Sequence, residues 1–323
     1  MKKHSLGAAH EGVERFEISF DGPVLADWRW PLVEIVGKRP GPSLHVMAGM
    51  HVNEVSSIEA AIRLQSCFDP GTLRGRVAIM PLVNVPAVHT YTEYNCPIDG
   101  KNINFSFPGR PDGSFSEVLA YAILHEWAAG ADVLVDLHGG DLRETVSKFV
   151  MYQRTGNAVE DESRRAVAMC FDADLVVGLE PKLLDRPGRS CTASAKRGRR
   201  AVLVEGGDNG IVDEISVQYH LQGAINVARH LGMIAGPLLP PARARVVCDR
   251  YIWVKCPSGG LFYPQVEPMT LVAKGQKLGE VRDYFGCIKG EIRAPESGYV
   301  LWRMTQPNLK ADDFALGIAT PAS

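Results

Sequence analysis

"LHVMAGMHVNEVSSIEAAIRL", residues 44–64, joins a nearly continuous apolar run to a segment that begins to look helical. The apolar run predicts a strand buried on both faces of a sheet. His51 and Glu54 stand where the chain should turn from this strand toward a helix. The stretch therefore predicts a layered α/β fold with two potential metal ligands at the end of a buried strand.

The same alternation of apolar runs and helical patterns extends from residue 32 to about residue 236. Further buried strands are predicted by "GRVAIMPLV", "ADVLVDL" and "AVLVE". Residues 116–129 and 213–231 carry apolar side chains at helical spacing, and Ser116 and Asp213 are the expected N-caps. These patterns predict an α/β domain over residues 1–242.

The pattern changes after "GMIAGPLLPPARAR", where prolines prevent a continuing helix. Short β-type runs follow, broken by Gly and Pro, and predict a small all-β domain over residues 243–323. The pattern "KGQKLGEV…GEIRAPESGYV" resembles the barrel-sandwich fold of biotinyl and lipoyl carrier domains. Cys287 stands where such a domain presents its modified lysine, and Lys289 is two positions away, so we interpret this domain as a structural addition.

Composition restricts the class of protein. The chain has 323 residues, of which 46% are hydrophobic, and 35 Lys and Arg against 37 Asp and Glu give a formal charge of -2. This balance argues against binding nucleic acid through phosphate neutralisation. The sequence contains no run of 18 apolar residues that would suggest a membrane span. The seven cysteines lack a C-x-x-C pair and are expected to be reduced. We therefore expect a cytoplasmic protein that acts on a small molecule, and a homo-oligomer stays open.

Three of the predicted strands end in chemically useful residues. His51 and Glu54 follow the first, His138 ends "VLVDLH", and Glu205 ends "AVLVE". Each is weak evidence alone, because a single His or Glu at a strand end usually has a structural role. In α/β sheets, however, ligands bind outside the carboxyl ends of the strands, so the four side chains are expected to meet in one crevice.

Two imidazoles and one carboxylate form a ligand set that suits a catalytic zinc ion with a water in the fourth position. The pKa of such a water falls toward about 7, and a nearby carboxylate, for which Glu205 is well placed, could take its proton. Asp136 precedes His138 by two residues and could support that ligand, although a buried hydrogen-bonded Asp would look the same. We expect one Zn²⁺ per chain, bound by His51, Glu54 and His138.

The order of "GMHVNE", "PIDGKNINFSFPG", "VDLHGG" and "VLVEGG" resembles the succinylglutamate desuccinylase/aspartoacylase family, relatives of the zinc carboxypeptidases. The resemblance covers nearly the whole chain. It implies a central mixed, twisted sheet flanked by helices, zinc ligands at His51, Glu54 and His138, and Glu205 as the general base that later protonates the leaving amine. It also implies hydrolysis of an N-acyl amino acid to a carboxylate and a free amine.

The chain departs from this family at the residues that bind the substrate carboxylate. Asn104 is present, but Phe105 and Tyr94 stand where the family carries arginines. Neither aromatic can replace a bidentate guanidinium. Either the substrate lacks that carboxylate, or another cation such as Arg110 or Lys101 binds it. Tyr94 could donate a hydrogen bond to a developing oxyanion, and core packing is the alternative for Phe105 and Phe107.

Three functions are compared on these grounds. The resemblance favours a deacylase, that is, a zinc-dependent amidohydrolase acting on C–N bonds other than peptide bonds. A zinc carboxypeptidase would use the same metal and base, but the lack of Arg at position 105 counts against it. A non-catalytic zinc-binding interaction module is the second alternative, and the presence of Glu205 argues against it.

Overall fold

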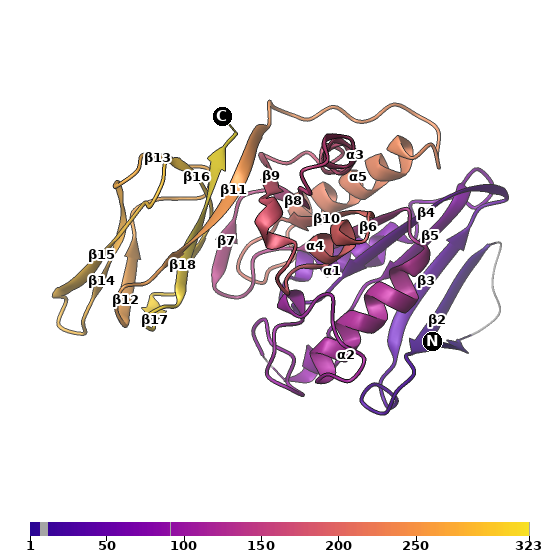
Figure 1. Ribbon diagram of the computed structural model, residues 1–323, viewed down its shortest axis with the longest axis horizontal. Coiled ribbons are helices and arrows are strands. Elements are labelled where there is room, and N and C mark those ends of the chain that lie inside the picture. Colours follow the sequence, from indigo (N-terminus) through magenta and orange to yellow (C-terminus); the bar gives the residue numbers. More distant parts are fainter. Residues whose placement is uncertain (7–11, 91, 323) are drawn as a thin grey trace.

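In a computed structural model, which describes residues 1–6, 12–90 and 92–322, a long mixed sheet runs through the molecule (Figure 1). The core of the sheet consists of parallel neighbours β5 (Arg74–Met80), β4 (Arg39–Ala48), β6 (Val133–His138) and β10 (Arg200–Glu205). These are the four strands that the apolar runs predicted. The α/β class with a central mixed sheet is confirmed.

Further strands extend this sheet on both sides. On one side β5 pairs with β3 (Trp30–Val36), which continues to β2 (Val13–Ser19) and β1 (Lys2–Ser5), all antiparallel. On the other side β10 pairs with β8 (Phe149–Gln153), and β8 pairs with β9 (Leu175–Leu179).

Helices cover both faces of the sheet, and alternate strand residues face each layer. α1 (Val55–Leu64), α3 (Ala158–Ala168) and α5 (Glu214–His230) pack on one face, while α2 (Phe115–Ala122) and α4 (Ser190–Lys196) pack on the other. The strand β10 illustrates the period of two, since Val202 and Val204 face the first layer and Ala201 and Leu203 the second. Burial on both faces explains why these strands are apolar throughout.

One predicted helix differs in its start and its end. Ser114, and not Ser116, is the N-cap of α2, because Ser114 forms a capping box with Glu117. The Ser116 hydroxyl instead donates to Asp99, at 2.8 Å. The segment predicted as one helix over 116–129 is helical throughout, but the α-helix ends at Ala122 and the chain continues to residue 130 through a wider and then a tighter helical turn. Asp213 caps α5 as predicted.

The C-terminal region is all-β as predicted, but it is joined to the first sheet. β11 (Val246–Lys255) pairs in parallel with β9 and continues to β18 (Phe314–Pro321), β16 (Gly298–Met304) and β13 (Leu271–Val272). The short β7 (Glu144–Val146) pairs with β16. The predicted boundary at residues 242 and 243 therefore lies just before a strand that continues the sheet.

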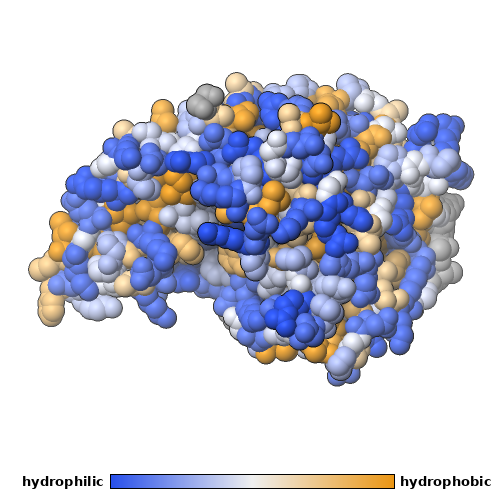
Figure 2. Space-filling view, in the orientation of Figure 1, coloured by the Kyte–Doolittle hydropathy of each residue, from blue (hydrophilic) through white to orange (hydrophobic). Residues whose placement is uncertain are grey.

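A second, four-stranded sheet completes the C-terminal region. It consists of β15 (Ile288–Arg293), β14 (Lys277–Arg282), β12 (Gly260–Pro264) and β17 (Asn308–Leu309). The outline of the molecule is indented between this region, at the left of the view, and the larger body (Figure 2). None of the helices in the described ranges is both long and apolar enough to cross a membrane.

Candidate active site

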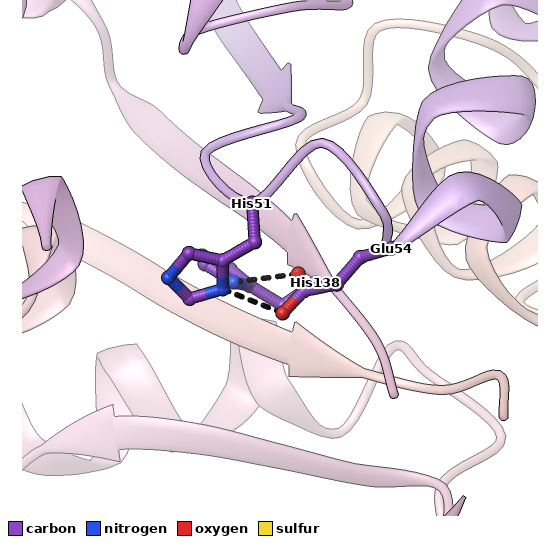
Figure 3. Close-up of side chains that lie close together, drawn as sticks. All are labelled: His51, Glu54 and His138. Atoms are coloured by element: carbon purple, nitrogen blue, oxygen red, sulfur yellow. Dashed lines mark hydrogen bonds and ion pairs between the residues drawn. The ribbon is translucent and has the colours of Figure 1, made fainter. Parts of the chain in front are cut away.

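The predicted metal ligands lie together at the carboxyl ends of two adjacent strands (Figure 3). β4 and β6 pair in parallel up to Ala48 and Leu137, so His51 and His138 follow at the same edge of the sheet. Glu54 is the residue that precedes the first turn of α1. The chain turns sharply at Gly49, directly after β4 and before α1. The φ of Gly49 is +66°, a left-handed conformation that favours glycine.

The three side chains converge on one point. The Nδ1 atom of His51 lies 2.6 Å from one Glu54 carboxylate oxygen, and that of His138 lies 2.9 Å from the other. All three residues are buried, and one ligand atom from each lies within 4.8 Å of the other two. Burial would raise the pKa of Glu54, but the imidazoles of His51 and His138 outweigh it and lower that pKa to about 2. Two imidazole nitrogens and an ionised carboxylate are the donors that a catalytic zinc ion takes.

Further polar residues contact the Nε2 atoms of both imidazole rings. The Nε2 atom of His138 lies 3.1 Å from Asp136, whose other carboxylate oxygen accepts from the Ser190 hydroxyl at 2.5 Å. The Nε2 atom of His51 lies 3.1 Å from the side-chain oxygen of Asn102. When Nε2 carries the proton in each ring, Nδ1 is left as the acceptor that a metal needs. The sequence suggested Asp136 in this position, whereas Asn102 and Ser190 were missed.

Two Gly-Gly pairs keep the loops after β6 and β10 in contact. The Gly140 N–H donates to the Gly207 carbonyl at 2.8 Å, and a Cβ on Gly139 would lie 2.5 Å from the Gly206 carbonyl. Residues with side chains would therefore force these loops apart. Glu205 pairs with His138 in register, so this approach keeps the expected base next to a metal ligand.

His51, Glu54 and His138, the expected metal-binding group, lie at a pocket of about 400 Å³, a size typical of small-molecule sites. Its walls include Glu205 and aromatic side chains that come largely from the C-terminal region, namely Phe105, Tyr251, Trp253, Trp302 and Phe314. Burial raises the pKa of Glu205 well above its usual value, and the imidazole of His138 only partly opposes this shift.

Of the predicted substrate-binding residues, three line this pocket. The ring of Tyr94 stands perpendicular to that of His51 with centroids 5.5 Å apart, and the Asn104 carboxamide oxygen is buried. Phe105 also lines the pocket and is 44% exposed, so it does not serve core packing, whereas Phe107 is fully buried.

The structure places the other candidate cations elsewhere. Arg110 is exposed and pairs with Asp112 at 3.2 Å, and Lys101 pairs with Glu117 at 2.9 Å. Neither residue lines the pocket. The basic run at residues 196–200 is also outside it, and Lys196 pairs with Asp185.

Two arginines that the sequence did not indicate do line the pocket. Arg143 pairs with Glu93 at 2.6 Å. Arg189, just before α4, lies 5.4–5.8 Å from the ring centroids of Phe105, Tyr251 and Trp253, and among the described residues it forms no ion pair. A half-buried guanidinium without a carboxylate partner can bind an anionic group of a ligand.

Glu144 adds a carboxylate to the same wall. Burial, reinforced by the negative charge of Glu54, raises the pKa of Glu144 to about 7. The hydroxyl of Tyr94 is its neighbour on one side and Asp141 on the other. Both acids follow the "DLHGG" motif closely in sequence, but nothing in their spacing indicated that Glu144 faces the pocket.

Residues 40–231 match the succinylglutamate desuccinylase/aspartoacylase catalytic domain. The chain belongs to this family. As a member of the succinylglutamate desuccinylase/aspartoacylase family it is a deacylase, a hydrolase that cleaves the C–N bond of an N-acylated amino acid or related amine. Family membership thus favours the deacylase over the carboxypeptidase and the non-catalytic module.

Individual relatives in this family are similar over most of their length. The N-alpha-acetyl-L-2,4-diaminobutyric acid deacetylase of Halomonas elongata is 29% identical over 294 residues, which are 89% of this chain and 84% of that protein. The product-bound structure of the ectoine utilization protein EutE (DoeB) from Ruegeria pomeroyi has a TM-score of 0.84 at 25% identity and covers 98% of both chains. A succinylglutamate desuccinylase/aspartoacylase structure from Rhodobacter sphaeroides, with a TM-score of 0.83 at 22% identity over 97% of both chains, has the same fold.

Proposed function

We propose that this protein is a zinc-dependent deacylase that removes an acetyl or similarly small acyl group from an amino acid. His51, Glu54 and His138 would hold the metal. The observation that carries the proposal is the convergence of these three buried donors beside Glu205 at a small-molecule pocket. When bound, zinc acts as a Lewis acid that polarises a carbonyl group and lowers the pKa of a water molecule.

Glu205 is proposed as the group that moves the proton. A carboxylate at this place accepts a proton from the attacking water and, once protonated, returns it to the nitrogen of the leaving amine. Burial raises the pKa of Glu205, which makes its carboxylate a stronger acceptor for the proton of the first step. Tyr94 is proposed to donate a hydrogen bond to the oxyanion, and the Asn104 carboxamide to orient the substrate.

Arg189 is proposed to bind the substrate carboxylate. Its guanidinium lines the pocket without an ion pair among the described residues, and it lies against a cluster of three aromatic rings. The absence of arginine at positions 94 and 105 suggested a preference for a neutral or cationic group. The alternative, a cation from elsewhere in the chain, now has a candidate in Arg189 in place of Arg110 or Lys101. The Halomonas relative is named for a substrate with such a carboxylate, so an Nα-acetyl amino acid is the substrate proposed here.

A comparison of an Nα-acetyl amino acid with its carboxamide tests this proposal. We expect the zinc-loaded protein to prefer the acid by about a hundredfold in kcat/KM, which corresponds to about 2.7 kcal/mol. Arg189→Met should abolish most of this preference, whereas the matched variant Arg110→Met should retain it. Equal rates on acid and amide in the unmodified protein would contradict the role of Arg189, and no hydrolysis of either would contradict the deacylase itself.

A further inference from the structure

A second cavity, which we call the β11 cavity, lies beside the active-site pocket. Its volume is about 390 Å³, and three of its residues, Arg189, Tyr251 and Trp253, also line the active-site pocket. A space of this size admits a small molecule. The residues that line the β11 cavity and not the active-site pocket are Leu179, Glu180, Lys182, Leu183, Arg250 and Ile252.

The strand β11 separates the two spaces. Its register with β18 is regular from Arg250 to Trp253, so successive side chains point to opposite faces. Tyr251 and Trp253 line the active-site pocket, whereas Arg250 and Ile252, at the alternate positions, line only the β11 cavity. Arg189, whose guanidinium lies 5.4 Å from the ring centroid of Tyr251, lines both spaces. It is therefore the charged group through which the two can influence each other.

The β11 cavity has an excess of positive charge. Its only carboxylate among the described residues, Glu180, pairs with Lys182 at 2.8 Å. The half-buried Arg189 and Arg250 form no ion pair within the described part of the chain, and the Nε atom of Arg250 is buried without an acceptor. Guanidinium groups keep their charge at physiological pH, so two cations stay unbalanced. A zinc ion in the active-site pocket would add positive charge and so would not balance them.

We propose that the β11 cavity binds a small anion through a carboxylate or phosphate group, and that this anion weakens binding of the substrate carboxylate. Guanidinium groups pair with both kinds of anion through two parallel hydrogen bonds. An anion between Arg250 and Arg189 shares the single charge of Arg189 with the substrate carboxylate, and the two anions repel each other. Each therefore weakens the binding of the other by the same factor. The anion site itself is independent of the proposed function, whereas its effect on the substrate rests on that function.

Titration calorimetry with inorganic phosphate, at constant ionic strength, tests the site directly. We expect the zinc-loaded full chain to bind a phosphate that Arg250→Met binds about tenfold more weakly, because charge-assisted hydrogen bonds are lost. Arg250→Lys keeps the charge and should retain more of the affinity. Arg110→Met, which removes an exposed arginine outside both spaces, is the control and should bind as the unmodified protein does. Equal affinities in Arg250→Met and the unmodified protein would overturn the inference, and so would a lack of phosphate binding by the unmodified protein, even if the variants do not fold.

Initial rates test the link to Arg189. We expect phosphate to raise KM for an Nα-acetyl amino acid by about fivefold or more with kcat unchanged, and to change KM for its carboxamide by less than about twofold. In Arg250→Met, phosphate should have neither effect. Equal inhibition on both substrates, or inhibition that persists in Arg250→Met, would overturn the inference, because it would place the phosphate in the active-site pocket. An unchanged KM for the acid would overturn the shared use of Arg189. If neither substrate is hydrolysed, the deacylase proposal fails, and the calorimetry still decides whether the β11 cavity binds an anion.

Discussion

The two ring nitrogens of His138 face different carboxylates. Nδ1 faces Glu54, and Nε2 faces Asp136, which Ser190 holds in turn. We expect His138→Ala to abolish zinc retention, because only two ligands would remain. Asp136→Asn should retain zinc with an affinity reduced by about 10- to 100-fold, since a neutral amide replaces the charged carboxylate that orients the ring. Metal analysis by mass spectrometry after dialysis measures both effects, and stoichiometric zinc in His138→Ala would show that the ligand is misassigned.

Substitution of Glu205 should show that metal binding and proton transfer depend on different residues. Glu205→Gln should leave the zinc content unchanged and lower kcat by about 10²- to 10⁴-fold, because an amide cannot accept the proton. Metal analysis and initial rates on the same preparation test both statements. Turnover close to that of the unmodified protein would place the base elsewhere, and Asp141 and Glu144 would then be examined.

At the scale of single elements, β4 carries a buried imidazole, His45, that is not one of the expected metal ligands. His45 packs against Trp127, with ring centroids 4.9 Å apart, and lies 3.2 Å from the Arg76 guanidinium. Burial, together with the charge of Arg76, lowers the pKa of His45 to about 3. The folded protein therefore keeps this ring neutral where the unfolded chain, with a pKa near 6.5, takes up a proton.

This difference makes β4 a source of acid sensitivity. Stability from neutral His45 is fully present above pH 6.5 and decreases as the pH falls toward 3, because only the unfolded state binds the proton. We expect the free energy of unfolding of His45→Gln to depend less on pH between 6.5 and 4 than that of the unmodified protein. Urea titrations across this range measure it, with the exposed His89→Gln as the control for loss of an imidazole. Parallel pH profiles for the unmodified protein and His45→Gln would contradict the assignment.

The helices and strands differ in how well the sequence predicts their type and their bounds. The four central strands were predicted because burial on both faces leaves a nearly continuous apolar run. The start of α2 was misplaced by two residues, because the Ser116 hydroxyl donates to Asp99 while Ser114 caps the helix. The expected metal ligands could be predicted because the carboxyl ends of parallel strands meet at one edge of the sheet. Arg189 could not, because it lines the pocket from a loop, and its position along the chain gives no sign of this.

Over the whole molecule, the pocket depends on contact between the two regions. β11 continues the sheet from β9, and its Trp253 lies near Phe105, Phe314 and Arg189. We expect Trp253→Ala to raise KM by about tenfold or more and to leave the zinc content unchanged, because it removes wall area but no ligand. Tyr284→Ala, at an exposed hairpin of the C-terminal region, should change neither. An unchanged KM in Trp253→Ala would show that this wall does not contact the substrate.

The join at β11 also has a consequence for how this chain can diversify. The groups proposed to break the amide bond lie at the ends of β4, β6 and β10, while many aromatic residues of the pocket wall lie on β11, β16 and β18. Substitutions on the later strands can alter which molecules are admitted while the hydrolytic groups stay in place. A library confined to the last quarter of the chain would therefore vary this part of the pocket wall alone, while Asn104, Phe105 and Arg189 on the larger body stay unchanged.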